Sequence, residues 1–251
     1  MNKLSIEQQA IRIRTELGYG PKIPIRWRSL LSELGILTVF KPIEAGLSGA
    51  VINVDQNVSI KLMLINTNRS IGHQHSTIAH ELYHLLVEPE VGSIVSYDIS
   101  NRRSARESNA DMFASFFVLP TEGLKSLVPS NELKKDAIGI DTILKIEHYY
   151  ACDRTTLAKR LKDIGLISKQ RAEEVQTDPK REAIERGYPT DLYERGNHHL
   201  VIGDYGVLAR KLYDKEMISK TNYKSLLADL EIDQHVASNL ESNHDKTSSI
   251  H

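Results

Sequence analysis

Apolar and polar residues alternate in a way that predicts two helices and a small sheet in the first part of the chain. Apolar residues spaced three or four apart predict helices over residues 5–17 and 26–34. Shorter apolar runs, bounded by glycines and an Asp-Gln-Asn turn, predict strands over residues 36–40, 48–54 and 59–65. We expect these strands to form a small antiparallel sheet that leads directly into the next helix.

Two longer helices are predicted after the sheet. The first covers residues 76–89, and Pro89 is expected to end it. Its apolar stripe has helical spacing and consists of Ile78, Leu82, Leu85 and Leu86. The second helix is predicted from about residue 103 to residue 118, ahead of Pro120.

A helix-turn-helix pattern follows within residues 120–168. Residues 139–150 and 154–163 read as two helices joined by a tight turn, and Gly165 closes the second. DNA binding is one interpretation, but between residues 139 and 171 seven Lys and Arg oppose only four Asp and Glu. This surplus is modest for an electrostatic DNA footprint. We therefore favour a packing unit that supports the neighbouring residues.

The chain becomes more polar from Gln170 onward. A linker is predicted there, followed by a helical hairpin over residues 204–219 and 220–230, whose apolar spacing suggests docking on the main body or on a partner. A short apolar strand is expected after His198 and His199. The tail over residues 238–251 is polar and is expected to be disordered.

Composition indicates a cytoplasmic protein. The chain has 251 residues, 32 Lys and Arg against 33 Asp and Glu, and 40% hydrophobic residues, which is enough for a real core. Its polar start does not resemble a signal peptide, and no run of about 18 apolar residues occurs. The single cysteine, Cys152, excludes an internal disulfide framework and is interpreted as a small buried residue.

The most informative motif is His80-Glu81-Leu82-Tyr83-His84, inside the first of the two longer helices. On a helix, His80 and His84 project from one face and can bind the same zinc ion. Glu81 lies at the edge of that face, where it could take a proton from an attacking water. This arrangement predicts hydrolysis of a peptide bond.

A catalytic zinc usually has a third protein ligand, and Glu107 on the second helix is the candidate. Asp111 lies one turn further on and could accept the free ring N–H of a zinc histidine. Ala110 and Ala114 are small and would let the two helices approach closely. The alternative is that Glu107 and its charged neighbours form an ordinary solvated helix start.

These residues resemble the ImmA/IrrE family of bacterial metallopeptidases over about residues 5–170. The resemblance is carried by the His-Glu-x-x-His helix, then Glu107-Ser-Asn-Ala-Asp-Met-Phe-Ala, then Val-Leu-Pro120. It implies a gluzincin-like site, with His80, His84 and Glu107 as zinc ligands and Glu81 as general base. It also implies a substrate class: helix-turn-helix transcriptional repressors, often encoded beside the peptidase in mobile elements and stress-response loci.

Two residues depart from the family pattern. Asp111 stands where the family often has Asn, which keeps a hydrogen-bond acceptor and adds charge. Tyr83 stands where the family often has Gly, and its bulk bears on the packing beside His84.

The predicted fold is therefore α+β, with a small antiparallel sheet packed on a zincin-type helix pair. We expect a metallopeptidase core over residues 1–125, a helix-turn-helix-like segment over 126–170 and a C-terminal accessory helical region over 171–237. The disordered tail follows.

Zinc peptidases also need a donor to the oxyanion, and the sequence does not choose among Tyr97, His148, Tyr149 and Tyr150. His148 and the remaining histidines near these segments are interpreted as surface or capping residues rather than catalytic groups: His73, His75, His148, His198 and His199. A competing hypothesis is a regulatory or antitoxin-like protein that binds DNA or a partner and carries a structural or vestigial zinc site. Glu81 argues against it, because a purely structural site does not require this residue.

Overall fold

The computed structural model describes residues 2–44, 46–55, 59–88, 92–97 and 104–229. The first half of the chain contains α1 (Lys3–Glu16), α2 (Trp27–Glu33), β1 (Ile36–Lys41), β2 (Leu47–Asp55), β3 (Ser59–Asn66), α3 (Ile71–Leu86), β4 (Gly92–Tyr97) and α4 (Ala105–Val118). The second half contains α5 (Thr121–Leu127), η1 (Ser130–Glu132), α6 (Ile140–Tyr150), α7 (Arg154–Asp163), α8 (Lys169–Glu174), α9 (Pro179–Glu185), η2 (Asp191–Tyr193), β5 (Val201–Ile202), α10 (Tyr205–Asp214) and α11 (Lys220–Asp229). The α+β class is confirmed.

The sheet is mixed, so the prediction of a wholly antiparallel sheet is wrong for one pair of strands. The strand order is β4-β2-β3-β1-β5, and β1 pairs with β3 in parallel while the other pairs are antiparallel. The reason is that β2 and β3 form a hairpin, and β3 inserts between β2 and β1. Strand β1 therefore runs alongside the returning arm of that hairpin.

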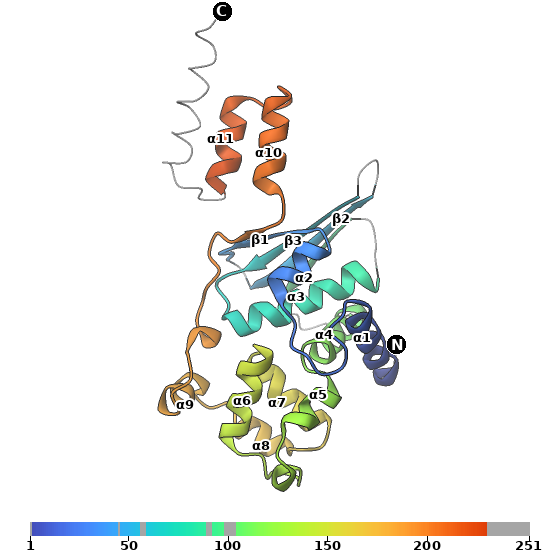
Figure 1. The fold of residues 1–251 in the computed structure, drawn as a ribbon, viewed down its shortest axis with the longest axis vertical. Helices are drawn as coiled ribbons and strands as arrows, with labels where there is room; N and C mark the ends of the chain where they lie inside the picture. Colours follow the sequence, from blue (N-terminus) through green and yellow to red (C-terminus); the bar gives the residue numbers. More distant parts are fainter. Residues whose placement is uncertain (1, 45, 56–58, 89–91, 98–103, 230–251) are drawn as a thin grey trace, which may run out of the picture.

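One face of the sheet packs on α3. Inward residues alternate with outward ones along β1, as expected for a sheet covered on one side. The buried side chains of this layer include Ile36, Phe40, Met63, Ile78 and Leu82. Figure 1 shows α2 and α3 on the same side of the sheet, with α1 and α4 beyond them.

Helix α3 begins at Ile71, five residues earlier than predicted. Ser70 caps it, because its side chain accepts a hydrogen bond from the His73 N–H (3.4 Å). The first turn contains Gly72, on which a Cβ would lie 2.9 Å from the backbone nitrogen of Asp153. This glycine allows α3 to approach the α6–α7 turn closely. The first turn of α3 has no apolar spacing that would have predicted the earlier start of the helix.

The predicted turn between α6 and α7 is present and rests on α3. Ala151 adopts the left-handed conformation (φ 51°), and Asp153 caps α7. Ser76 on α3 donates to Asp153 Oδ2 (2.7 Å), and His75 Nδ1 donates to the carbonyl of Ala151 (2.7 Å). These contacts match the interpretation of the pair as a packing unit.

Two of the basic residues on α7 are buried and not available to DNA. Arg160 donates to the Leu119 carbonyl (3.1 Å) and lies over the ring of Phe116. Arg154 is 3% exposed and donates to both oxygens of Glu147, at 2.5 and 3.0 Å. Burial of these guanidinium groups further reduces the modest positive surplus of this segment.

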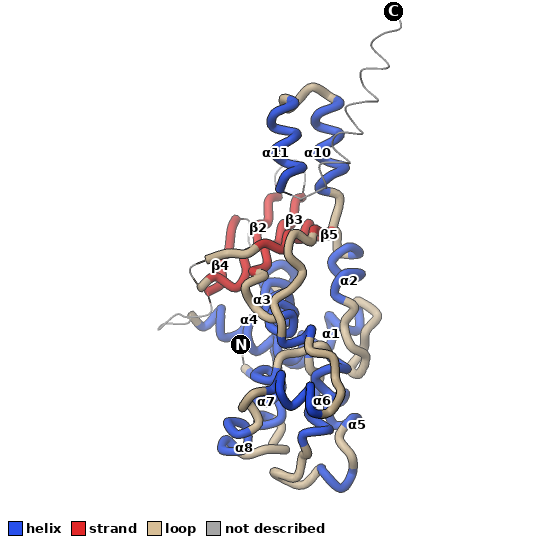
Figure 2. Tube along the Cα trace, turned by 90° about the vertical axis from the view of Figure 1, so that its left-hand side faces the viewer, coloured by secondary structure: helices blue, strands red, loops and turns tan. Residues whose placement is uncertain are grey.

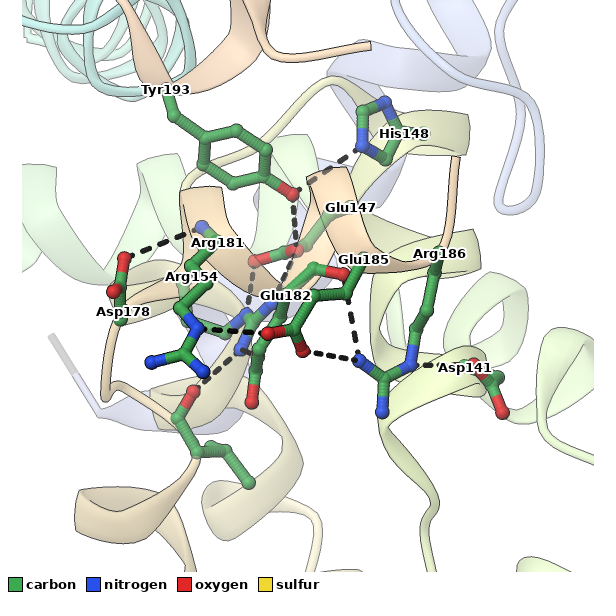
Figure 3. Close-up of polar contacts among 11 residues, drawn as sticks. Asp141, Glu147, His148, Arg154, Asp178, Arg181, Glu182, Glu185, Arg186 and Tyr193 are labelled. Atoms are coloured by element: carbon green, nitrogen blue, oxygen red, sulfur yellow. Dashed lines mark hydrogen bonds and ion pairs between the residues drawn. The ribbon is translucent and has the colours of Figure 1, made fainter. Parts of the chain in front are cut away.

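Arg154 is the centre of a polar network that ties the following segment to α6 and α7 (Figure 3). It also donates to Glu182 on α9 (2.7 Å), and the Tyr193 hydroxyl donates to Glu147 Oε2 (2.9 Å). His148, on the same helix as Glu147, stacks on Tyr188. The network fixes the path of the chain from α8 to η2.

From η2 the chain returns across α3 to the sheet. The Ile71 N–H donates to the Glu194 carbonyl (2.9 Å), and Asn197 Nδ2 donates to Gln74 Oε1 (2.9 Å). The short strand expected after His199 is β5, which pairs with β1. The predicted domain boundaries stay predictions, but the region after residue 170 contributes this strand to the core sheet.

The predicted C-terminal hairpin is α10–α11. Figures 1 and 2 both place the sheet between this hairpin and the remaining helices. Its buried residues, Ala209, Tyr223 and Leu227, pack with one another in a cluster separate from the main core. Docking of the hairpin on the main body or on a partner stays a prediction. The predicted tail lies outside the described residues. Every helix in the described ranges is too short or too polar to cross a membrane.

Candidate metal centre

His80 and His84 lie one turn apart on α3 and bring their ring nitrogens together. The two Nε2 atoms are 3.3 Å apart, and the ring centroids are 5.1 Å apart. The side chains are 12% and 0% exposed, respectively. The helix spacing predicted this proximity, because residues four apart share one face.

Glu107 reaches the same point from the first turn of α4. Its Oε2 lies 3.1 Å from His80 Nε2, and its Oε1 lies 3.5 Å from His84 Nε2. Ala110 and Ala114 are buried, as the predicted close approach of the two helices requires. Helix α4 begins at Ala105, two residues later than predicted, with Ser104 as its cap.

These three side chains form a group that could hold a metal ion, with donor atoms all within 4.8 Å of one another. Donors about 2.0–2.1 Å from a tetrahedral ion are about 3.3–3.4 Å apart, as simple geometry requires. The 3.3 Å between the two Nε2 atoms matches that value, and Glu107 approaches His80 with Oε2 (3.1 Å) and His84 with Oε1 (3.5 Å). Two imidazole nitrogens and one carboxylate therefore fit zinc and leave a fourth position for a water or a substrate.

Asp111 lies one turn after Glu107 and orients His80. The Nδ1–H of His80 donates to Asp111 Oδ1 (3.0 Å), which leaves Nε2 directed at Glu107 and His84. A carboxylate in this place fixes the ring and makes the imidazole more basic. The structure thus places Asp111 beside a candidate ligand, as the sequence predicted.

The pKa values of the two histidines are driven apart. Burial lowers the pKa of His80, but its hydrogen bonds to Asp111 and Glu107 outweigh burial and raise the pKa to about 10. Burial and the positive charge on His80 lower the pKa of His84 to about 4. The hydrogen bond from His80 lowers the pKa of Glu107 despite partial burial. In the metal-free site, His80 is the group that keeps a proton at neutral pH.

Glu81 is fully buried between α3 and the sheet. Both of its carboxylate oxygens are shielded from solvent. A Cβ on Gly49 of β2 would lie 2.9 Å from Glu81 Oε1 and 2.7 Å from Thr77 Cγ2. Glycine at this point therefore makes room for the carboxylate beside the histidine face.

Tyr83 is buried beside His84, and its contacts show how the site accommodates a tyrosine at this position. Its ring packs edge-on against His84 (5.6 Å between centroids) and at a tilt against Phe113 of α4 (5.5 Å). Its hydroxyl donates to Glu88 Oε1 (2.7 Å). The tyrosine therefore fills the space between the two helices.

The oxyanion donor predicted among four residues is not identified. Tyr150 is buried and its hydroxyl donates to the Lys22 carbonyl (2.7 Å), while His148 contacts Tyr193 and Tyr188. Tyr149 is 45% exposed. Tyr97 ends β4, but its side chain is outside those that the structure describes.

Among the described histidines, His75 and His198 have contacts outside the metal group. His75 stacks on Trp27, and the ring of His198 is hydrogen-bonded to Thr67 Oγ1 (2.9 Å). Sequence reasoning missed Gly49, Glu88 and Arg106 beside the site. The spacing Ser104-x-x-Glu107 is a capping-box pattern that could have located the start of α4, and no comparable local signal marks Gly49.

Comparison with known proteins identifies the family. The profile of the IrrE N-terminal-like domain, peptidase family M78, matches residues 31–162, just over half of the chain. The match includes both helices of the metal group and the α6–α7 pair. A search of curated proteins finds no match. The chain belongs to the IrrE N-terminal-like family of M78 peptidases.

Proposed function

We propose that the chain is a zinc-dependent endopeptidase that cuts a protein substrate at a specific site. The observation that carries the proposal is the convergence of donor atoms from His80, His84 and Glu107 within 4.8 Å of one another, with Glu81 buried at the position after His80. The peptidase family of the chain supports it. Zinc is favoured over harder cations because two of the three donors are imidazoles.

The residues of the chain divide the chemistry among them. A bound zinc ion would act as a Lewis acid and provide a water nucleophile near neutral pH. Asp111 holds the His80 ring in the tautomer whose Nε2 faces the metal position. Glu81 accepts the proton of the attacking water and passes it to the nitrogen of the leaving amine. Gly49 leaves the space in which the Glu81 carboxylate can transfer this proton.

The sheet supports an extended protein substrate. Strand β4 is the last strand at one edge of the described sheet, next to β2, which carries Gly49 against Glu81. An extended peptide can pair with such an edge through backbone hydrogen bonds. We propose a helix-turn-helix transcriptional repressor encoded nearby as substrate, in stress response or mobile-element regulation, because the motif resemblance implies this class.

A second candidate is a regulatory protein that binds a partner. It is favoured by the hairpin α10–α11, on which Val207, Leu208 and Met217 are more than half exposed. DNA binding is less favoured, because Arg154 and Arg160 of α7 are buried.

The test is to mix the protein with the helix-turn-helix protein encoded beside its gene, with zinc and with a chelator. We expect one discrete cleavage product that depends on zinc, identified by intact mass. Absence of cleavage at every zinc concentration, together with a stable complex between the two proteins, would favour the second candidate.

A further inference from the structure

Glu107 lies in a part of α4 that apolar packing does not fix. It is in the first turn of the helix, where Ala105 and Ser108 are exposed, and the first buried residue of α4 is Ala110. Helix ends fray unless they are held. A ligand at this position therefore depends on polar contacts.

Arg106 and Glu88 provide such a contact next to Glu107. Arg106 Nε lies 3.1 Å from Glu88 Oε2, and its Nη2 donates to the Glu88 carbonyl at 3.5 Å. Glu88 lies two residues after the end of α3, the helix that carries both histidines. The ion pair thus joins the segment just after α3 to the first turn of α4. Its side chains are only 28% and 31% exposed, so solvent screens them incompletely.

Tyr83 fixes the position of Glu88. Its hydroxyl donates to Glu88 Oε1 (2.7 Å), so the two carboxylate oxygens of Glu88 contact Tyr83 and Arg106 separately. The Tyr83 ring is held by His84 and Phe113 and is fully buried. The rigid Tyr83 ring therefore holds Glu88, and Glu88 in turn contacts Arg106, the residue before Glu107.

We propose that Tyr83, Glu88 and Arg106 form a clamp that positions Glu107 for metal binding. The proposal rests on the proposed function, because it assigns the clamp a role in holding the third ligand. The clamp residues are positioning residues and do not bind the metal themselves. Tyr83, which departs from the family pattern, is part of this clamp.

The first test compares zinc affinities measured by competition with a chromophoric chelator. Glu88→Gln and Arg106→Gln should each weaken zinc binding about tenfold, the lower end of what loss of an outer partner does. Arg106→Lys keeps the charge but not the guanidinium that reaches both the carboxylate and the carbonyl of Glu88, so its loss should be smaller than that of Arg106→Gln, between about twofold and about tenfold. Glu122→Gln is the matched control, since it breaks an exposed ion pair with Lys22 (2.9 Å) that includes no residue of the clamp or the metal group.

A double-mutant cycle separates positioning from general destabilisation. If the clamp acts through Glu107, Glu88→Gln should have no further effect on zinc affinity in the Glu107→Gln background. A merely structural role would give the same loss in both backgrounds. Cobalt-substituted Glu88→Gln should also show an altered visible spectrum, because the coordination by Glu107 changes.

Wild-type zinc affinity in Glu88→Gln and in Arg106→Gln would overturn the clamp. The clamp would also be overturned if Glu88→Gln lowered zinc affinity as much in the Glu107→Gln background as in the unsubstituted protein. Should Glu88→Gln fail to fold, Tyr83→Phe tests the same chain of contacts, because it removes only the hydroxyl. Failure of the unsubstituted protein to bind zinc would contradict the proposed function itself, which is a different result.

Discussion

Zinc binding to this site should displace about one proton from the two histidines, and the number of protons released should not fall between pH 6 and pH 7. The reason is that the metal takes the place of the proton that His80 shares with Glu107. The perturbation is therefore simply the addition of zinc to the metal-free protein at several pH values.

The magnitude follows from the two histidine pKa values. With the pKa of His80 raised to about 10, nearly all sites carry that proton throughout this range, and each must lose it. With the pKa of His84 lowered to about 4, that ring is already neutral and releases almost nothing. Two unperturbed histidines would instead release about 1.5 protons at pH 6 and about 0.5 at pH 7. Zinc affinity should accordingly strengthen about tenfold per pH unit up to the pKa of His80.

The assay is titration calorimetry in pairs of buffers that bind zinc weakly and differ in ionisation enthalpy. The buffer dependence of the binding enthalpy gives the number of protons released. Asp111→Asn should release fewer protons at alkaline pH, because it weakens the hydrogen bond that raises the pKa of His80. A proton release that falls from pH 6 to pH 7 would refute the reasoning.

Three further predictions concern single residues. Gly49→Ala should lower the cleavage rate about 100-fold with little change in zinc content, because the new Cβ displaces the Glu81 carboxylate; an unchanged rate would count against that contact. Glu107→Gln should weaken zinc binding by more than about tenfold in a chelator competition, and unchanged affinity would remove it from the ligand set. Arg154→Met should lower the free energy of unfolding by about 3–5 kcal/mol, because Glu147 is left buried and unpaired, and Glu147→Leu combined with Arg154→Met should recover most of it in denaturant titrations.

Local spacing predicted the parts of the site that a single helix determines. His80, Glu81 and His84 lie within two turns, so helix geometry alone brings the histidine rings together. Glu107 could be nominated because only one nearby helix offered a carboxylate beside small residues. Its distance from the histidines, however, is set by tertiary packing.

The features that the sequence did not predict depend on contacts between distant segments. The parallel pairing of β1 with β3 follows from where the β2–β3 hairpin docks, which no local pattern encodes. Strand β4 was not predicted, because Gly92-Ser-Ile-Val-Ser-Tyr97 is short and alternates weakly. Gly49 acquires its role only because β2 lies against Glu81.

The central claim is that Glu81 is the general base of a zinc peptidase. The most direct measurement is the zinc content and the cleavage rate of Glu81→Gln beside the unsubstituted protein, with the proposed helix-turn-helix repressor as substrate. We predict equal zinc content and a rate lower by at least about 100-fold, the usual contribution of a general base. Full cleavage by Glu81→Gln with zinc bound would contradict the account.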